Sequence, residues 1–171
     1  MTVIFLHGLE SGPHGGKYKA LTKSFGEDVV ISPDCTGITD VASRYRKVCE
    51  DLAGVAGPLI LVGSSFGGLM ALMYAEQHPD KVSAMVLCCP ALLPKYQRYW
   101  GGLRTPWCPV TIIHGKEDDI VPPQASQSWA EAHGATLVLV EGDHRLSDQN
   151  NRLLLEVGFA HVQVEGWSPA M

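Results

Sequence analysis

The chain has 171 residues, of which 46% are hydrophobic and 18% are charged, a composition that excludes a disordered protein. This length suits one domain whose core needs neither disulfides nor a structural metal. Thirteen Lys and Arg against eighteen Asp and Glu give a net charge of −5, which argues against nucleic acids and anionic membranes as partners. No apolar run approaches the length of a membrane span, and no signal peptide is expected at the N-terminus.

The cysteine pattern predicts free thiols. There are five cysteines, an odd number, and no two are spaced as C-x-x-C. Cys88 and Cys89 are adjacent within an apolar run, where free cysteine packs as a small hydrophobic side chain. Reduced thiols are typical of the cytoplasm, so a cytoplasmic location is expected. A redox pair formed by Cys88 and Cys89 is the alternative.

Short apolar runs alternate with longer helical patterns along the chain. The expected elements, in order, are a strand at 3–6, a helix at 16–25, a strand at 29–31, a helix at 39–54, a strand at 59–62, a helix at 66–78, strands at 85–88 and 110–113, a helix at 123–133, a strand at 137–140 and a helix within 149–162. Strands separated by helices pair in parallel, and consecutive apolar residues are typical of strands covered on both faces. The sequence therefore predicts a single three-layer α/β domain over residues 1–171, with about six parallel strands.

Residues 63–67 read Gly-Ser-Ser-Phe-Gly and lie between an apolar strand and an apolar helix. The G-x-S-x-G pattern is weak alone, but a tight strand-to-helix turn lifts its central hydroxyl above the sheet edge. The serine would also stand at a helix N-terminus, where main-chain amides favour negative charge. Ser65 is therefore the candidate nucleophile, and a residue that only caps the helix is the alternative. Ser64 lies one residue short of the apex.

A serine hydroxyl needs a general base, and the base needs an acid that orients it. His144 follows the strand at 137–140, at the same end of the sheet as Ser65, and is the candidate base. The acid is expected in the loop after the strand at 110–113. Asp118 is the candidate there, with Asp119 as the alternative.

These residues resemble the α/β-hydrolase superfamily. The order Ser65, Asp118, His144, each in a loop after a strand, is that of its triad. His114 to Pro122 is similar to its H-G-x-x-D-x-x-V-P segment, and the G-D-H ending at His144 to its G-x-H segment. The opening His-Gly of residues 7–8 resembles its oxyanion loop. Within the superfamily, the chain is most similar to the small bacterial esterases of the YqiA type, which have no cap domain.

The resemblance implies a sheet without the family's first two strands, in the order 2-1-3-4-5-6 as numbered in this chain. The oxyanion loop and the serine turn would then meet at the topological switch point between strands one and three. It also implies that the main-chain N–H groups of Leu9 and Phe66 hold the oxyanion. His7 and His114 are open to two interpretations: each ring braces its loop, or it contacts substrate.

The segment from Cys89 to Pro109 is too short for a cap domain but contains four large aromatic residues. One interpretation is a short helix packed on the sheet edge. The other is an aromatic wall that binds an acyl chain. The candidate substrate-binding residues are Tyr96, Tyr99, Trp100 and Trp107.

The sequence thus predicts a cofactor-free serine esterase or thioesterase that acts on a small-molecule substrate through Ser65, His144 and Asp118. No H-E-x-x-H motif or Cys/His cluster is present in the sequence, so no metal is expected, although Glu117, Asp118 and Asp119 are an acidic alternative. Amide or lactone hydrolysis and acyl transfer use the same triad. A non-catalytic binding protein on a hydrolase scaffold and a metal-dependent hydrolase are the remaining alternatives.

Overall fold

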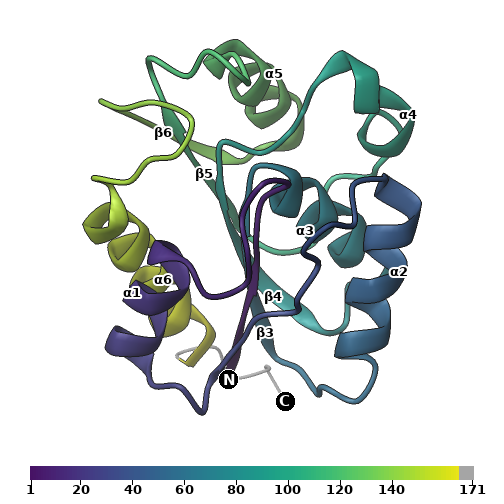
Figure 1. The fold of residues 1–171 in the computed structure, drawn as a ribbon, viewed down its shortest axis with the longest axis vertical. Helices are drawn as coiled ribbons and strands as arrows, with labels where there is room; N and C mark the ends of the chain where they lie inside the picture. Colours follow the sequence, from purple (N-terminus) through teal and green to yellow (C-terminus); the bar gives the residue numbers. More distant parts are fainter. Residues whose placement is uncertain (166–171) are drawn as a thin grey trace.

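The computed structural model describes residues 1–165, which form one parallel sheet covered by helices (Figure 1). The strands are β1 (Thr2–Leu6), β2 (Val30–Ile31), β3 (Leu59–Ser64), β4 (Val82–Cys88), β5 (Val110–Gly115) and β6 (Thr136–Val140). The helices are α1 (Gly16–Phe25), α2 (Val41–Leu52), α3 (Phe66–Gln77), the 3-10 turn η1 (Pro94–Tyr96), α4 (Gln97–Trp100), α5 (Pro123–His133) and α6 (Asn150–Glu165). The end of the predicted domain, residues 166–171, lies outside the described residues.

The predicted six-stranded parallel sheet is confirmed. All five strand pairs are parallel, and the order is β2-β1-β3-β4-β5-β6. Strand β4 begins at Val82, three residues before the predicted start. The prediction began too late because the polar Ser83 interrupts the apolar pattern. Helix α2 begins at Val41 because the Asp40 carboxylate accepts a hydrogen bond from the Ser43 amide and caps the helix.

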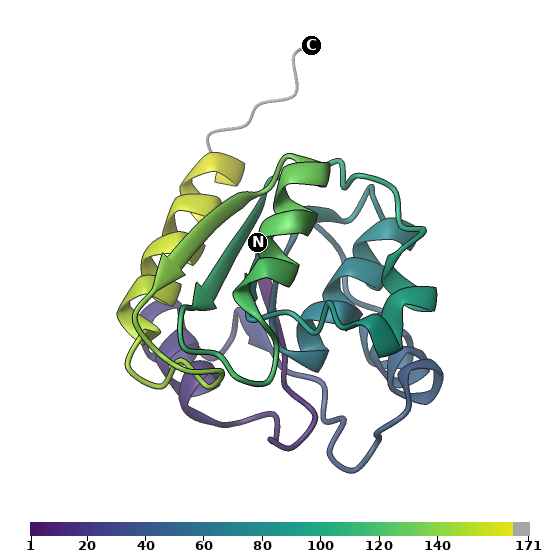
Figure 2. The same cartoon turned by 90° about the horizontal axis from the view of Figure 1, so that it is seen from above.

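Helices cover both faces of the sheet. Helices α1 and α6 lie side by side on one face, and α2, α3 and α5 lie on the other (Figures 1 and 2). Successive strand residues pack into two separate hydrophobic cores, one on each face of the sheet. Leu61 packs in the core under α2 and α3, and Val62 packs in the core under α1 and α6. Both side chains are fully buried, so the consecutive apolar run is the signature of a sheet buried on two sides.

The strand order reverses between β1 and β3, which are hydrogen-bonded neighbours. Their carboxyl ends, at Leu6 and Ser64, are therefore neighbours at the topological switch point, the position where ligands bind in open α/β sheets. Strands β5 and β6 end at the same edge of the sheet. Strand β6 forms the border of the sheet, and its Thr136 and Leu139 side chains are exposed.

The structure describes all five cysteines as free thiols. Burial raises the pKa of the Cys88 thiol to about 11. Between residues 1 and 165, no helix has both the length and the apolar character needed to cross a membrane.

Candidate active site

The turn after β3 has the backbone strain that its sequence predicts. Ser65 has φ 54° and ψ −113°, a conformation that non-glycine residues rarely adopt. A Cβ on Gly63 would lie 2.6 Å from the Gly67 carbonyl oxygen, and a Cβ on Gly67 would lie 1.9 Å from the Leu6 carbonyl oxygen. Glycine is therefore required on both sides of Ser65, because the turn packs directly on the backbone of β3 and β1.

The structure brings Ser65, His144 and Asp118 together. His144 Nε2 lies 2.8 Å from Ser65 Oγ, and His144 Nδ1 lies 2.8 Å from Asp118 Oδ2. Because the carboxylate can only accept, Nδ1 carries the hydrogen and Nε2 presents a lone pair to the Ser65 hydroxyl. The three residues are far apart in the sequence and meet because their strands end at one edge of the sheet.

The surroundings of Asp118 keep its carboxylate ionised. Burial pushes its pKa upward, but hydrogen bonds from His144 and from the Val121 and Ile120 amides outweigh it, so the pKa lies below its usual value. Both amides donate to Oδ1 at 2.9 Å. The neighbouring Asp119, the alternative acid in the sequence, is exposed.

A second histidine, His114, contacts the same carboxylate. It is fully buried, and its Nε2 lies 2.8 Å from the Val121 carbonyl oxygen and 3.1 Å from Asp118 Oδ2. Its Nδ1 lies 2.7 Å from the Ser126 hydroxyl of α5. Burial lowers the His114 pKa despite the hydrogen bonds to Val121 and Asp118, so the ring is neutral and donates through Nε2. His114 therefore braces the Asp118 loop.

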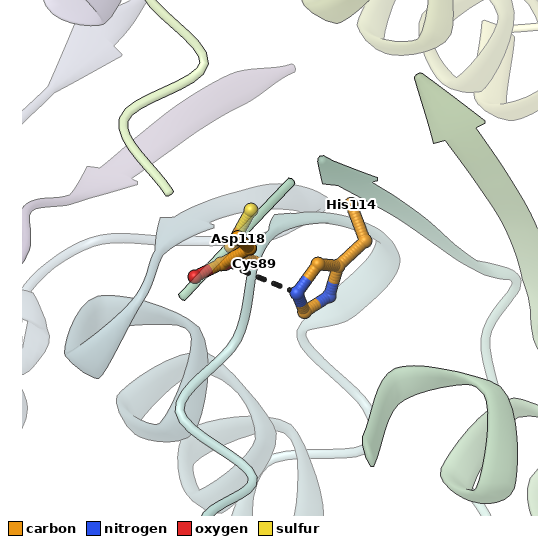
Figure 3. Close-up of side chains that lie close together, drawn as sticks. All are labelled: Cys89, His114 and Asp118. Carbon is orange, nitrogen blue, oxygen red and sulfur yellow. Dashed lines mark ion pairs between the residues drawn. The ribbon is translucent and has the colours of Figure 1, made fainter. Parts of the chain in front are cut away.

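Cys89, His114 and Asp118 form a buried cluster whose ligand atoms all lie within 4.8 Å of one another (Figure 3). A metal would need the His114 Nε2 lone pair, but that nitrogen carries a hydrogen directed at Val121 O and Asp118 Oδ2. Burial also raises the pKa of the Cys89 thiol and keeps it protonated, whereas metals bind the thiolate. The donor set therefore fits a hydrogen-bond network better than a metal centre.

The loop after β1 lies against Ser65. A Cβ on Gly8 would lie 3.7 Å from Ser65 Cβ. Within residues 1–165, the main-chain N–H groups of Leu9 and Phe66 have no hydrogen-bond acceptor, and Phe66 is the first residue of α3. One unpaired donor therefore lies on the loop after β1 and the other at the start of α3, next to the serine, where the resemblance predicts the oxyanion site.

His7 braces this loop. Its Nε2 accepts a hydrogen bond from the Cys35 amide at 2.9 Å, so its hydrogen is on Nδ1, which lies 2.8 Å from the Gly8 carbonyl oxygen. Burial lowers the His7 pKa despite the hydrogen bond to Gly8, which agrees with a neutral ring.

The aromatic segment after β4 forms the short helix α4, which packs against α3. Three of the aromatic residues are partly buried against the core: Tyr96, Tyr99 and Trp100. The Tyr96 and Phe66 rings pack edge to face, with 5.3 Å between their centroids. Trp107 is 85% exposed. The predicted short helix is thus observed, but it packs on α3 and not on the edge of the sheet. Substrate binding by the four aromatic residues stays a prediction.

Arg44 and Ser126 are two buried polar residues near the site that sequence reasoning missed. Arg44 is the fourth residue of α2, three positions after Val41 and four before Val48, so it shares the buried side of the helix with these two residues. Ser126 is one of two serines in α5, and no motif contains it. Their only sequence signal is a polar residue on the buried side of a helix.

Comparison with known proteins agrees with this architecture. A family model described as the alpha/beta hydrolase fold matches residues 31–103. A structure of an α/β-superfamily protein from Xanthomonas campestris superimposes with a TM-score of 0.74, at 27% identity, over 96% of this chain and 98% of that one. The fold and the superfamily resemblance are therefore confirmed, while the YqiA-type grouping stays a prediction.

Two similar curated proteins are named as hydrolases of acyl groups. The mouse protein "palmitoyl-protein thioesterase ABHD10, mitochondrial" is 28% identical over 216 aligned positions, which cover 90% of this chain and 72% of that protein. The Xenopus laevis protein "monoacylglycerol lipase abhd6-B" is 32% identical over 102 positions, covering 53% of this chain and 30% of the lipase.

Proposed function

Because this chain belongs to the α/β-hydrolase superfamily, we propose that it is a serine hydrolase that cleaves carboxylic esters or thioesters through an acyl-enzyme. The observation that carries the proposal is the continuous hydrogen-bonded series from Ser65 Oγ through His144 to Asp118, with 2.8 Å at each step. A non-catalytic scaffold has no need to hold these three groups in register.

In the first half of the reaction, His144 Nε2 takes the Ser65 proton as Oγ attacks the substrate carbonyl carbon. The carbonyl oxygen becomes an oxyanion, which the Leu9 and Phe66 amides stabilise. His144 then gives its proton to the leaving alkoxide or thiolate, and the acyl group remains on Ser65. Asp118 holds the imidazole in the required tautomer and stabilises its charged form.

In the second half, His144 takes a proton from water, and the hydroxide attacks the acyl carbon. The tetrahedral intermediate collapses, the C–O bond to Ser65 breaks, and His144 returns the proton to Oγ. A carboxylic acid leaves, and the enzyme is regenerated. No cofactor takes part in this proposed sequence.

Acyl thioesters are the first substrates to test. The relative that aligns with 90% of this chain is named a palmitoyl-protein thioesterase, whereas the lipase aligns with about half of it. The proposed substrate-binding residues Tyr96, Tyr99, Trp100 and Trp107 belong to the segment next to Phe66. A matched series of esters and thioesters of increasing acyl length separates the two classes, and competing acceptors detect acyl transfer. The cytoplasmic location stays a prediction.

The proposal is tested with a fluorophosphonate probe and an ester or thioester assay. We expect labelling at Ser65, and we expect Ser65→Ala to abolish labelling and to lower kcat by at least about 10³-fold. Ser64→Ala is the matched control, because it removes the adjacent hydroxyl while leaving the Ser65–His144 contact in place. Turnover by Ser65→Ala at the rate of Ser64→Ala would remove Ser65 from the mechanism.

A further inference from the structure

Arg44 is a buried cation beside the proposed oxyanion site, and only main-chain carbonyls receive its hydrogen bonds in the described part of the chain. Its side chain is 1% exposed. Nε donates to Ile38 O at 2.8 Å, and Nη2 donates to Cys35 O at 3.1 Å. Nη1 donates to both His7 O at 2.9 Å and Gly8 O at 3.2 Å. A residue used only for folding would have little reason to bury a charge against the functional loop.

The Gly8 carbonyl is the key acceptor, because it belongs to the same peptide unit as the Leu9 N–H. Three donors converge on it: His7 Nδ1 at 2.8 Å, Arg44 Nη1 at 3.2 Å and Ser11 Oγ at 3.3 Å. In a trans peptide the C=O and N–H point in opposite directions, so fixing the oxygen fixes the direction of the Leu9 N–H. A charged donor on the oxygen also polarises the peptide and strengthens that N–H as a donor.

Arg44 also contacts the start of α3, directly after Ser65. Its guanidinium lies 5.0 Å from the centre of the Phe66 ring, and the Phe66 amide is the second proposed oxyanion donor. One side chain thus contacts both segments that carry the two unpaired N–H groups, the loop after β1 and the start of α3. Burial lowers the Arg44 pKa, but an arginine keeps its charge at neutral pH.

We propose that Arg44 is a positioning residue that holds the Gly8–Leu9 peptide as an oxyanion donor and keeps it polarised. This inference rests on the proposed function. It assigns to helix α2, which contributes no residue to the triad, the task of preorganising the oxyanion site. Preorganised donors stabilise the transition state because they need not reorient as charge develops.

Arg44→Lys is the main test, because lysine keeps the positive charge but replaces the planar guanidinium, with its several N–H donors in fixed directions, by a single ammonium group. We expect kcat to fall by about 10–100-fold with little change in KM, since a misplaced oxyanion donor weakens the transition state selectively. A boronic acid that forms a tetrahedral adduct with Ser65 should lose affinity by the same factor. Arg46→Lys is the matched control, because Arg46 is exposed on the same helix.

Ser11→Ala provides a second variant that does not disturb the core. Ser11 is exposed, and its hydroxyl donates to the same Gly8 carbonyl. We expect a loss in kcat of about 3-fold, again without a change in KM, because one of three donors is removed. This variant decides the matter if Arg44→Lys does not fold, as judged by circular dichroism.

Two outcomes separate this inference from the proposed function. If the wild-type protein is labelled at Ser65 but folded Arg44→Lys matches Arg46→Lys in kcat and boronate affinity, Arg44 serves stability alone and the inference is wrong. If Arg44→Lys does not fold, a Ser11→Ala variant with the kcat of the wild-type protein also shows that the inference is wrong. If the wild-type protein is neither labelled nor active, the proposed function fails and the inference falls with it.

Discussion

At the scale of single residues, four donor groups surround the Asp118 carboxylate. Two main-chain amides donate to Oδ1, while the rings of His144 and His114 approach Oδ2 at 2.8 and 3.1 Å. These contacts offset the burial of the charge and fix the direction of the lone pairs. The carboxylate can therefore hold His144 in one orientation and one tautomer.

Asp118→Asn should lower kcat by about 10⁴-fold while leaving KM close to its original value, because an amide that donates to His144 Nδ1 favours the wrong tautomer. Steady-state kinetics with the best ester or thioester substrate measures this loss. Asp119→Asn removes the adjacent exposed carboxylate and should behave as the wild-type protein. Equal losses in the two variants would contradict a specific role for Asp118.

At the scale of structural elements, the turn between β3 and α3 and the loop after β1 are fitted to each other. A Cβ at Gly67 would overlap the backbone of Leu6 and lie 2.7 Å from the His7 carbonyl oxygen. Backbone cannot move aside as a flexible side chain can. The serine turn and the oxyanion loop are therefore one packed unit whose geometry is set by main-chain contact.

Gly67→Ala should lower the free energy of unfolding by about 3 kcal/mol or more, at the upper end of overpacking effects, because the new methyl group meets backbone. Urea unfolding measures the change. Gly158→Ala in α6 is the matched control: its Cβ would have no heavy atom within 4 Å, and alanine is the better helix former. A Gly67→Ala variant as stable as Gly158→Ala would show that the two loops are not in direct contact.

The sequence predicts the strands and the order of the triad because both rest on local signals. Apolar runs locate the strands, and Ser65, Asp118 and His144 each follow one of these runs. The same local reasoning cannot assign a role to Arg44, because two of its acceptors, His7 O and Gly8 O, belong to a loop that is distant from it in the chain. For the acid, the H-G-x-x-D-x-x-V-P resemblance favours Asp118 over Asp119. The burial of Asp118 and the exposure of Asp119 depend on where the loop packs, which the local sequence does not predict.

At the scale of the whole molecule, two buried neutral histidines link stability to pH. Burial lowers the pKa values of His7 and His114 below their ordinary value of 6.5, despite opposing hydrogen bonds. Below that value the unfolded chain binds protons that the folded protein does not. Stability is therefore highest above pH of about 6.5 and decreases as the pH falls, by at most about 1.4 kcal/mol per pH unit for each histidine.

Urea unfolding between pH values of about 8 and 5 should show this decrease. The Asp118 carboxylate, whose pKa is lowered, contributes a further loss only below its ordinary value of 3.8, so it does not affect this range. His114→Gln should reduce the slope of stability against pH, whereas His14→Gln, at an exposed histidine, should leave it unchanged. A slope that is the same in both variants would rule out His114 as a source of the pH dependence.

The position of β6 at the border of the sheet has a consequence for how the protein would lose activity. The loop that carries His144 follows this border strand, in which Thr136 and Leu139 are exposed to solvent. The Ser65 turn, in contrast, follows β3, a central strand of the sheet. Border strands fray at lower energetic cost than central ones. Mild heating or a low concentration of denaturant should then abolish activity reversibly while the central strands stay folded. Loss of activity would therefore measure local unfolding at β6 and not global unfolding of the domain.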